Sequence, residues 1–165
     1  MRRVVSDTGP ILHLHEANAL HLLTAAGEVL IPPAVDRELT RLIPNWAPPD
    51  GLDCRPLSSA GRKRAEAWTE SGLIDPGEAS AVVLAEELSA DWFLTDDTAA
   101  RVVAGGLGLE VHGALGVVLW AAAVGRLDRD AATATLRQLF ESSLWVSPRV
   151  RTEALALLDD LFAPG

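Results

Sequence analysis

Short apolar runs alternate with longer amphipathic segments in this 165-residue chain, and this alternation constrains the fold more than any other feature. We interpret the short runs as strands and the segments with apolar residues at helical spacing as helices. Strands are predicted at Val4–Val5, Glu28–Ile31, Trp92–Thr95 and Leu109–His112. Helices are predicted at Ile11–Ala26, Pro33–Leu42, Ser58–Glu70, Ala79–Leu88, Thr98–Leu107, Gly113–Val124, Asp128–Glu141 and Pro148–Phe162, with a loop at Pro44–Pro56. The alternation predicts a three-layer α/β/α fold with a central parallel sheet and right-handed crossovers.

An aspartate directly follows the first predicted strand. Val4 and Val5 form the strand, Asp7 stands just beyond it, Thr8 is the expected N-cap of the next helix, and Pro10 suits its first turn. In open α/β sheets, ligands bind at the carboxyl ends of the strands, where Asp7 is expected. The alternative is that Asp7 only caps the helix.

Acidic residues recur at comparable positions further along the chain. Asp96 and Asp97 follow the third predicted strand, so they should lie at the same edge of the sheet as Asp7. Glu78 falls in the first turn of the helix that leads into that strand, and Glu38 lies in the helix after the second strand. The sequence therefore predicts that these carboxylates converge on one acidic pocket.

Converging carboxylates repel one another, which should raise some of their pKa values unless a cation neutralises them. Mg²⁺ or Mn²⁺ takes oxygen ligands, retains water and assists the hydrolysis of phosphodiesters. We therefore expect a divalent metal site, with the alternative that the acids are independent helix caps and surface groups.

Composition narrows the possible functions. The formal net charge of −9 does not suit tight, sequence-independent binding to DNA, which favours a basic surface. The single cysteine, Cys54, excludes an internal disulfide framework and suits a reducing cytoplasm. The apolar run after Arg3 is too short for a signal peptide, and Ala114–Val124 is too short to span a membrane, so neither is expected.

Histidine and tryptophan gave weaker signals. His13 and His15 are two residues apart and do not share a helical face, so a structural or surface role is expected for both and for His21. Trp46 in the proline-rich loop is interpreted as either a core residue or a contact residue.

Four segments, in this order, give the chain a recognisable family pattern: Val5–Pro10, Ile31–Leu39, Gly77–Ala79 and Leu94–Asp97. With them the sequence resembles the PIN-domain ribonucleases, particularly the VapC-like toxins with Ser-Asp-Thr-x-Pro near the start. His112–Val117 also resembles that subgroup. The resemblance implies a PIN-like domain over residues 1–125 and leaves 126–165 as a helical extension packed on the same domain.

The acids of the family pattern are carried over one at a time. Its first aspartate matches Asp7, and its glutamate after the second strand matches Glu38. Its third acid, often an aspartate, matches Glu78, and its Thr-x-Asp element places a supporting hydroxyl on Thr95 and the last acid on Asp97. Asp96 is an additional neighbour, and the sequence does not decide which of Asp96 and Asp97 points inward.

The resemblance implies an Mg²⁺- or Mn²⁺-dependent endoribonuclease that cleaves single-stranded RNA and is often restrained by a protein antitoxin. Trp46 and the apolar helices beyond Asp128 further predict a homodimer. The main alternative is a PIN-like module that acts only by binding.

Three other classes fit less well. Asp7-Thr8-Gly9 occurs in aspartic proteases, but those are rich in β-structure. A haloacid-dehalogenase phosphatase needs an aspartate where this chain has Gly9, and a receiver domain needs a late lysine, whereas the only lysine is Lys63.

Overall fold

The computed structural model describes residues 1–165 and contains one five-stranded parallel sheet with the strand order β3-β2-β1-β4-β5. The strands are β1 (Arg3–Ser6), β2 (Glu28–Ile31), β3 (Leu52–Cys54), β4 (Trp92–Leu94) and β5 (Val111–His112). The helices are α1 (Thr8–Glu16), α2 (Leu20–Ala26), α3 (Pro33–Leu42), α4 (Ser59–Glu70), α5 (Pro76–Glu87), α6 (Thr98–Gly106), α7 (Ala114–Ala123), α8 (Arg129–Glu141) and α9 (Pro148–Leu161).

β1 is the central strand. It pairs in parallel with β2 on one side and β4 on the other, and Val4 and Val5 are fully buried because helices cover both faces of the sheet. The register sets Val5 beside Phe93, and the backbone N–H of Asp7 donates to Leu94 at 2.9 Å. The residues that follow β1 and β4 therefore leave the sheet side by side at its carboxyl edge.

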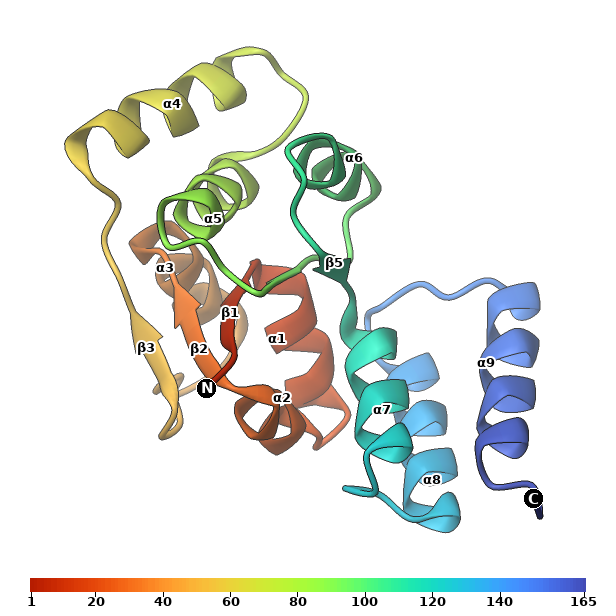
Figure 1. The fold of residues 1–165 in the computed structure, drawn as a ribbon. Helices are drawn as coiled ribbons and strands as arrows, with labels where there is room; N and C mark the ends of the chain where they lie inside the picture. The colour runs from red at the N-terminus through yellow and green to blue at the C-terminus, as the bar shows by residue number, and fades with distance from the viewer.

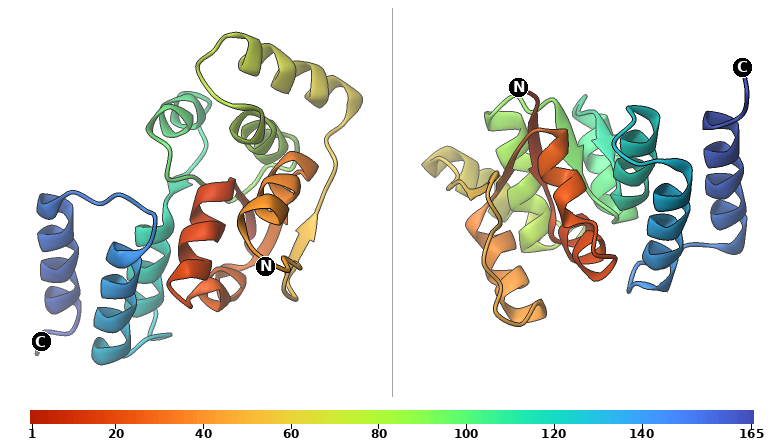
Figure 2. Two further views of the ribbon diagram at one scale, coloured as in Figure 1. Left: turned by 180° about the vertical axis from the view of Figure 1, so that it is seen from behind. Right: turned by 90° about the horizontal axis from the view of Figure 1, so that it is seen from below.

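The helices form two layers around the sheet. α1 and α2 pack with α7, whereas α5 packs with α4 and α6 (Figures 1 and 2). α5 carries an almost fully buried Ala/Val/Leu stretch that contacts β1 and β4. The predicted three-layer α/β/α fold is confirmed.

The last three helices stand together beside the sheet domain. α7, α8 and α9 contact one another, and α8 also contacts α1 (Figure 1). The loop from α8 to α9 passes the carboxyl edge of the sheet, where the Ser143 hydroxyl donates a hydrogen bond to Glu16. Treating 126–165 as an extension of a 1–125 domain stays our proposal.

Three local predictions were wrong. The predicted helix Ile11–Ala26 is two helices, because Asn18 between them adopts a left-handed backbone conformation with φ 57°, which asparagine tolerates better than most residues. Asp7, not Thr8, is the N-cap of α1. The loop Pro44–Pro56 contains the edge strand β3, which the prolines around it concealed.

No helix in the structure has the length and apolar character needed to cross a membrane.

Candidate active site

A cavity of about 610 Å³ opens at the carboxyl edge of the sheet. Its lining residues are Asp7, Thr8, Gly9, His13, Glu38, Asp75, Glu78, Asp96, Asp97, Thr98, Ser143, Leu144 and Trp145. The structure thus brings together all five acids singled out from the sequence. The sixth predicted residue, Thr95, is fully buried at the end of β4 and contacts two of them.

Asp7 is the most buried of these acids, with 5% of its surface exposed. Its Oδ1 accepts a hydrogen bond from the Thr8 N–H at 2.7 Å, and its Oδ2 accepts one from the Thr95 hydroxyl at 3.0 Å. Burial raises the pKa of Asp7 from 3.8 to about 7, the two hydrogen bonds lower it, and the negative charges of Glu78 and Asp75 raise it further. Asp7 is therefore a carboxylate held where its negative charge is costly.

Thr95 connects the ends of the two central strands. Its hydroxyl donates to Asp7 and accepts a hydrogen bond from the backbone N–H of Asp97 at 3.1 Å. Because one hydroxyl bridges both segments, the carboxylate of Asp7 and the start of α6 are held in a fixed relative position.

Two glycines make room for neighbouring carboxylates. A Cβ atom at Gly77 would collide with the Glu38 carboxylate, and one at Gly113 would collide with Oδ1 of Asp96. The Thr8 hydroxyl donates a hydrogen bond to Glu38, which fixes the free end of that side chain beside the first turn of α1. Gly77 thus allows the start of α5 to approach Glu38 on α3, and Gly113 allows the start of α7 to approach Asp96.

Glu78 lies in the first turn of α5 and forms a capping box with Asp75. Its Oε2 accepts from the Asp75 N–H at 2.9 Å, and its own N–H donates to Asp75 Oδ1 at 2.8 Å. Burial raises the pKa of Glu78 from 4.5 to about 7, the backbone hydrogen bond lowers it, and the charges of Asp75, Asp97 and Glu38 raise it. The expected rise in pKa is confirmed for Asp7 and Glu78, but burial contributes more to it than the mutual repulsion we had expected.

Asp96 and Asp97 both reach the cavity but have different partners. Asp97 is the N-cap of α6 and accepts from the Ala100 N–H at 2.8 Å through Oδ2. Asp96 uses both oxygens: Oδ1 accepts from the Ala114 N–H at 2.8 Å, and Oδ2 lies 2.7 Å from Nδ1 of His13. The charge of Asp97 also contributes to the rise in the pKa of Glu78.

A family model described as a PIN domain matches residues 3–160. The chain belongs to the PIN-domain family. Members of this family are generally nucleases, and the match includes α8 and nearly all of α9. No protein of curated function matches the chain significantly.

His13 also lines the cavity, and its contact with Asp96 is compatible with the structural role expected from the sequence. His13 lies on α1, two turns from Asp7, and packs against Gly9 and Asp96. The argument from helix faces is correct in one respect, since His15 lines a different cavity. The sequence did offer one clue to this position of His13. The helix that contains it begins directly after Asp7, so the first two turns of that helix lie close to the edge of the sheet where Asp7 stands.

The donor set of this PIN domain suits a hard divalent cation. Every acidic ligand is a carboxylate oxygen, and no thiol lines the cavity. As the side chains stand, no group of three or more His, Cys, Asp or Glu residues is arranged to hold an ion. Asp7, Glu78 and Asp97 would hold the ion best, with Glu38 and Asp96 at the margin.

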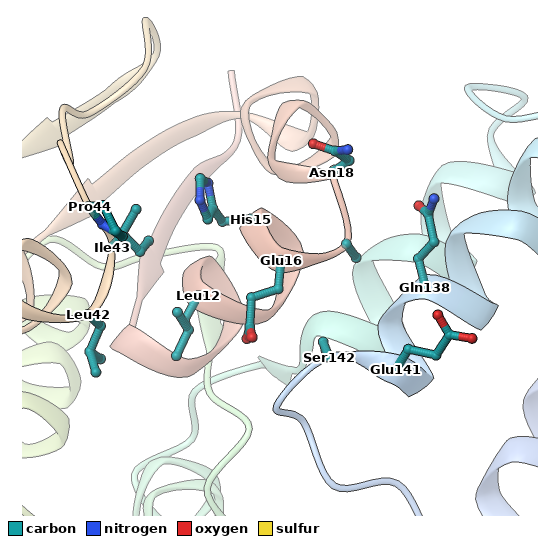
Figure 3. Close-up of a pocket in the computed structure, with 11 residues that line it drawn as sticks. Leu12, His15, Glu16, Asn18, Leu42, Ile43, Pro44, Gln138, Glu141 and Ser142 are labelled. Carbon is teal, nitrogen blue, oxygen red and sulfur yellow. The ribbon is translucent and has the colours of Figure 1, made fainter.

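A second cavity of about 610 Å³ lies between α1, α3 and α8 of the PIN domain (Figure 3). Its lining includes His15, Glu16 and Glu141, but none of the acids predicted from the sequence. The cavity at the sheet edge is the candidate active site, because the buried carboxylate with the raised pKa lies there.

Proposed function

We propose that this PIN domain is an Mg²⁺- or Mn²⁺-dependent endoribonuclease that cleaves single-stranded RNA, and that it is the VapC-like toxin of a toxin–antitoxin pair. The residues assigned to the reaction are Asp7, Glu38, Glu78, Asp97, Asp96 and Thr95. We further propose that it acts as a homodimer, with a protein antitoxin as a second partner.

One observation carries the nuclease proposal. The buried polar residues of the whole chain are Ser6, Asp7, Thr8 and Thr95, and all of them lie at the carboxyl ends of β1 and β4. Burying polar groups costs free energy unless hydrogen bonds compensate, and folds concentrate this cost where chemistry needs it. The acid in that set, Asp7, is also the group whose pKa burial raises to about 7.

The roles of the side chains follow from their contacts. Thr95 and the Thr8 N–H orient the two oxygens of Asp7, and each oxygen keeps a lone pair free for a further ligand. The hydrogen bonds to Glu78 and Asp97 use Oε2 and Oδ2, so Oε1 of Glu78 and Oδ1 of Asp97 are left for a further ligand. A divalent cation bound there would activate water and neutralise the charge that develops on an attacked phosphate.

The test is incubation of the purified protein with a mixed pool of RNA in Mg²⁺, in Mn²⁺ and in EDTA. We expect cleavage in both metals, none in EDTA, and cleavage slowed about a thousandfold in Asp7→Asn. Asp53→Asn on β3 is the matched control, because it removes the same charge from an exposed position outside the cavity. Full activity in excess chelator, or in folded Asp7→Asn, would overturn the proposal.

A non-catalytic PIN-like binding module is the second candidate. The observation that favours it is that no three of the His, Cys, Asp and Glu side chains are arranged to hold an ion as they stand. Metal binding measured by calorimetry, together with no cleavage of the RNA pool, would support this candidate over the nuclease.

A further inference from the structure

Trp145 is an exposed tryptophan on a well-anchored loop. It lies between α8 and α9 and is 81% exposed, although Val146 beside it is only 6% exposed and Leu144 packs against the core. The position of this exposed indole in the lining of two adjacent cavities makes its aromatic face available to a bound group.

The loop is held on both sides of this tryptophan. Before it, the hydroxyl and N–H of Ser143 both donate to Oε1 of Glu16 on α1. After it, Nε of Arg151 on α9 donates to the carbonyl of Val146 at 3.0 Å. The indole of Trp145 therefore protrudes from a backbone that is already positioned.

Trp145 stands between the acidic cavity and a second, more apolar groove. The groove has a volume of about 410 Å³ and shares Asp96, Leu144 and Trp145 with the acidic cavity. Its apolar wall consists of Val111, Leu115, Leu119, Leu144, Val146 and Val150. The volume lies within the range of about 300–1,000 Å³ that is typical of sites for small organic groups.

The negative charge of the acidic cavity means that a bound strand of RNA requires attractive contacts outside that cavity, and the groove can supply them. The carboxylates of the acidic cavity repel phosphate, so the attraction that holds the rest of the strand has to come from elsewhere. Arg101 lines the groove next to Asp96, and its Nη2 donates to the carbonyl of Thr95 at 3.2 Å. A positive charge and an aromatic face are thus available on one side of the acids, and they are the two elements that bind single-stranded nucleic acid.

We propose that Trp145 stacks on an unpaired nucleobase of the RNA, that the apolar groove receives this base, and that Arg101 neutralises a phosphate next to the one at the acidic cavity. The proposal rests on the proposed ribonuclease function and adds a binding subsite to it. Because a base inside a duplex is already stacked on its neighbours, the subsite selects single-stranded RNA. Stacking on an indole accepts every base, so the subsite adds affinity rather than a strict sequence requirement.

The test measures RNA affinity without cleavage. A fluorescently labelled single-stranded oligonucleotide is titrated, with anisotropy as the readout, into Asp7→Asn protein and into the same protein carrying Trp145→Ala. We expect the Kd to rise about tenfold, the usual effect of losing one base–aromatic stack. Trp145→Phe should restore most of the affinity, and Val102→Ala, at another highly exposed apolar position, should leave it unchanged.

An oligonucleotide with single abasic positions identifies the partner of the indole. Removing the stacked base should weaken binding as much as Trp145→Ala does, and combining the two changes should add little further loss. A duplex of the same sequence should bind Trp145→Ala and its parent equally.

The outcomes separate the subsite from the nuclease. Cleavage by the wild type, with the same KM and Kd in Trp145→Ala, would overturn the subsite alone. Neither binding nor cleavage by the wild type would overturn both. Unchanged RNA affinity in Trp145→Ala, with a change in its mass by light scattering or a loss of binding to a protein partner, would assign the indole to a protein contact and overturn the subsite.

Discussion

The ends of β1 and β4 look alike in sequence but differ in electrostatics. In each, an aspartate after a buried strand caps the next helix, Asp7 for α1 and Asp97 for α6. The end of β1 supplies Asp7 with neutral hydrogen-bond donors only, so burial raises its pKa to about 7. The end of β4 carries a second acid, Asp96, whose carboxylate has the imidazole of His13 and a backbone N–H as partners.

A strand followed by an acid therefore gives two chemically distinct carboxylates in this chain, Asp7 after β1 and Asp96 after β4. Both carboxylates have a hydrogen-bond partner on each oxygen, but burial outweighs the neutral partners of Asp7 and leaves a costly negative charge that a cation would relieve, whereas Asp96 has the imidazole of His13 as a partner. We therefore expect Asp7 to serve the reaction mainly and Asp96 to serve the structure mainly, and four predictions test that division.

The largest effect should be on catalysis. Asp7→Asn is expected to lower the rate of RNA cleavage by about a thousandfold, because it removes the carboxylate that is best placed to hold a cation. Asp96→Asn is expected to lower it only about tenfold, through the displacement of His13. The measurement is single-turnover cleavage in saturating Mg²⁺, and equal losses in the two variants would abolish the distinction between them.

The second effect concerns pH. The folded-state pKa of Asp7 lies above its unfolded value, so the folded protein binds the proton more tightly and metal-free stability should increase as the pH falls through 7 toward 4. Between pH 8 and pH 5, the free energy of unfolding of the wild type should rise by about 2–3 kcal/mol relative to that of Asp7→Asn. Urea unfolding across this range in EDTA measures the difference, and parallel pH profiles for the two proteins would contradict the prediction.

The third effect is a stability change of opposite sign in the two variants. In EDTA at pH 8, Asp7→Asn should stabilise the protein by about 1–2 kcal/mol, because relief from the buried charge exceeds the weakened hydrogen bonds. Asp96→Asn should destabilise it by a similar amount, since charge-assisted bonds to Ala114 and His13 become neutral ones. Thermal melting should show shifts of about 2–8 °C in opposite directions. A lower melting temperature for Asp7→Asn would show that Asp7 is only a helix cap.

The smallest effect is stabilisation by metal. Mg²⁺ or Mn²⁺ at ten times its Kd should stabilise the wild type by about 1.4 kcal/mol, because the ion binds the folded state only. Asp97→Asn should lose this response, whereas Asp96→Asn should keep most of it. The melting temperatures of the three proteins with and without metal decide between Asp96 and Asp97 as the inward acid.

Regular periodicity made most of the fold predictable. The strands and helices around Asp7, Glu78 and Asp97 were placed from patterns of a few residues, and parallel pairing then brought the acids to one edge. The exceptions depend on tertiary context: β3 is a three-residue edge strand between prolines, and the break at Asn18 interrupts an unbroken helical pattern.

The site was predictable only where local sequence marks it. Acids after strands are visible in the chain, but the contact between His13 and Asp96 joins residues 83 positions apart. Trp145 gave no signal either, because the sequence does not show that the α8–α9 loop returns to the sheet edge. Local patterns thus located the carboxylates and missed the groups that reach them through tertiary packing.

The position of Ser143, Leu144 and Trp145 in the wall of the cavity has a consequence for the order of events during synthesis. A ribosome delivers Asp7 long before this loop, so a nascent chain can form β1, β2 and the first helices while one side of the cavity is still missing. The hydrogen bonds from Ser143 to Glu16 then join a late part of the chain to an early one. The cavity is therefore completed only after residues 143–145 have been synthesised, long after Asp7 and the first strands.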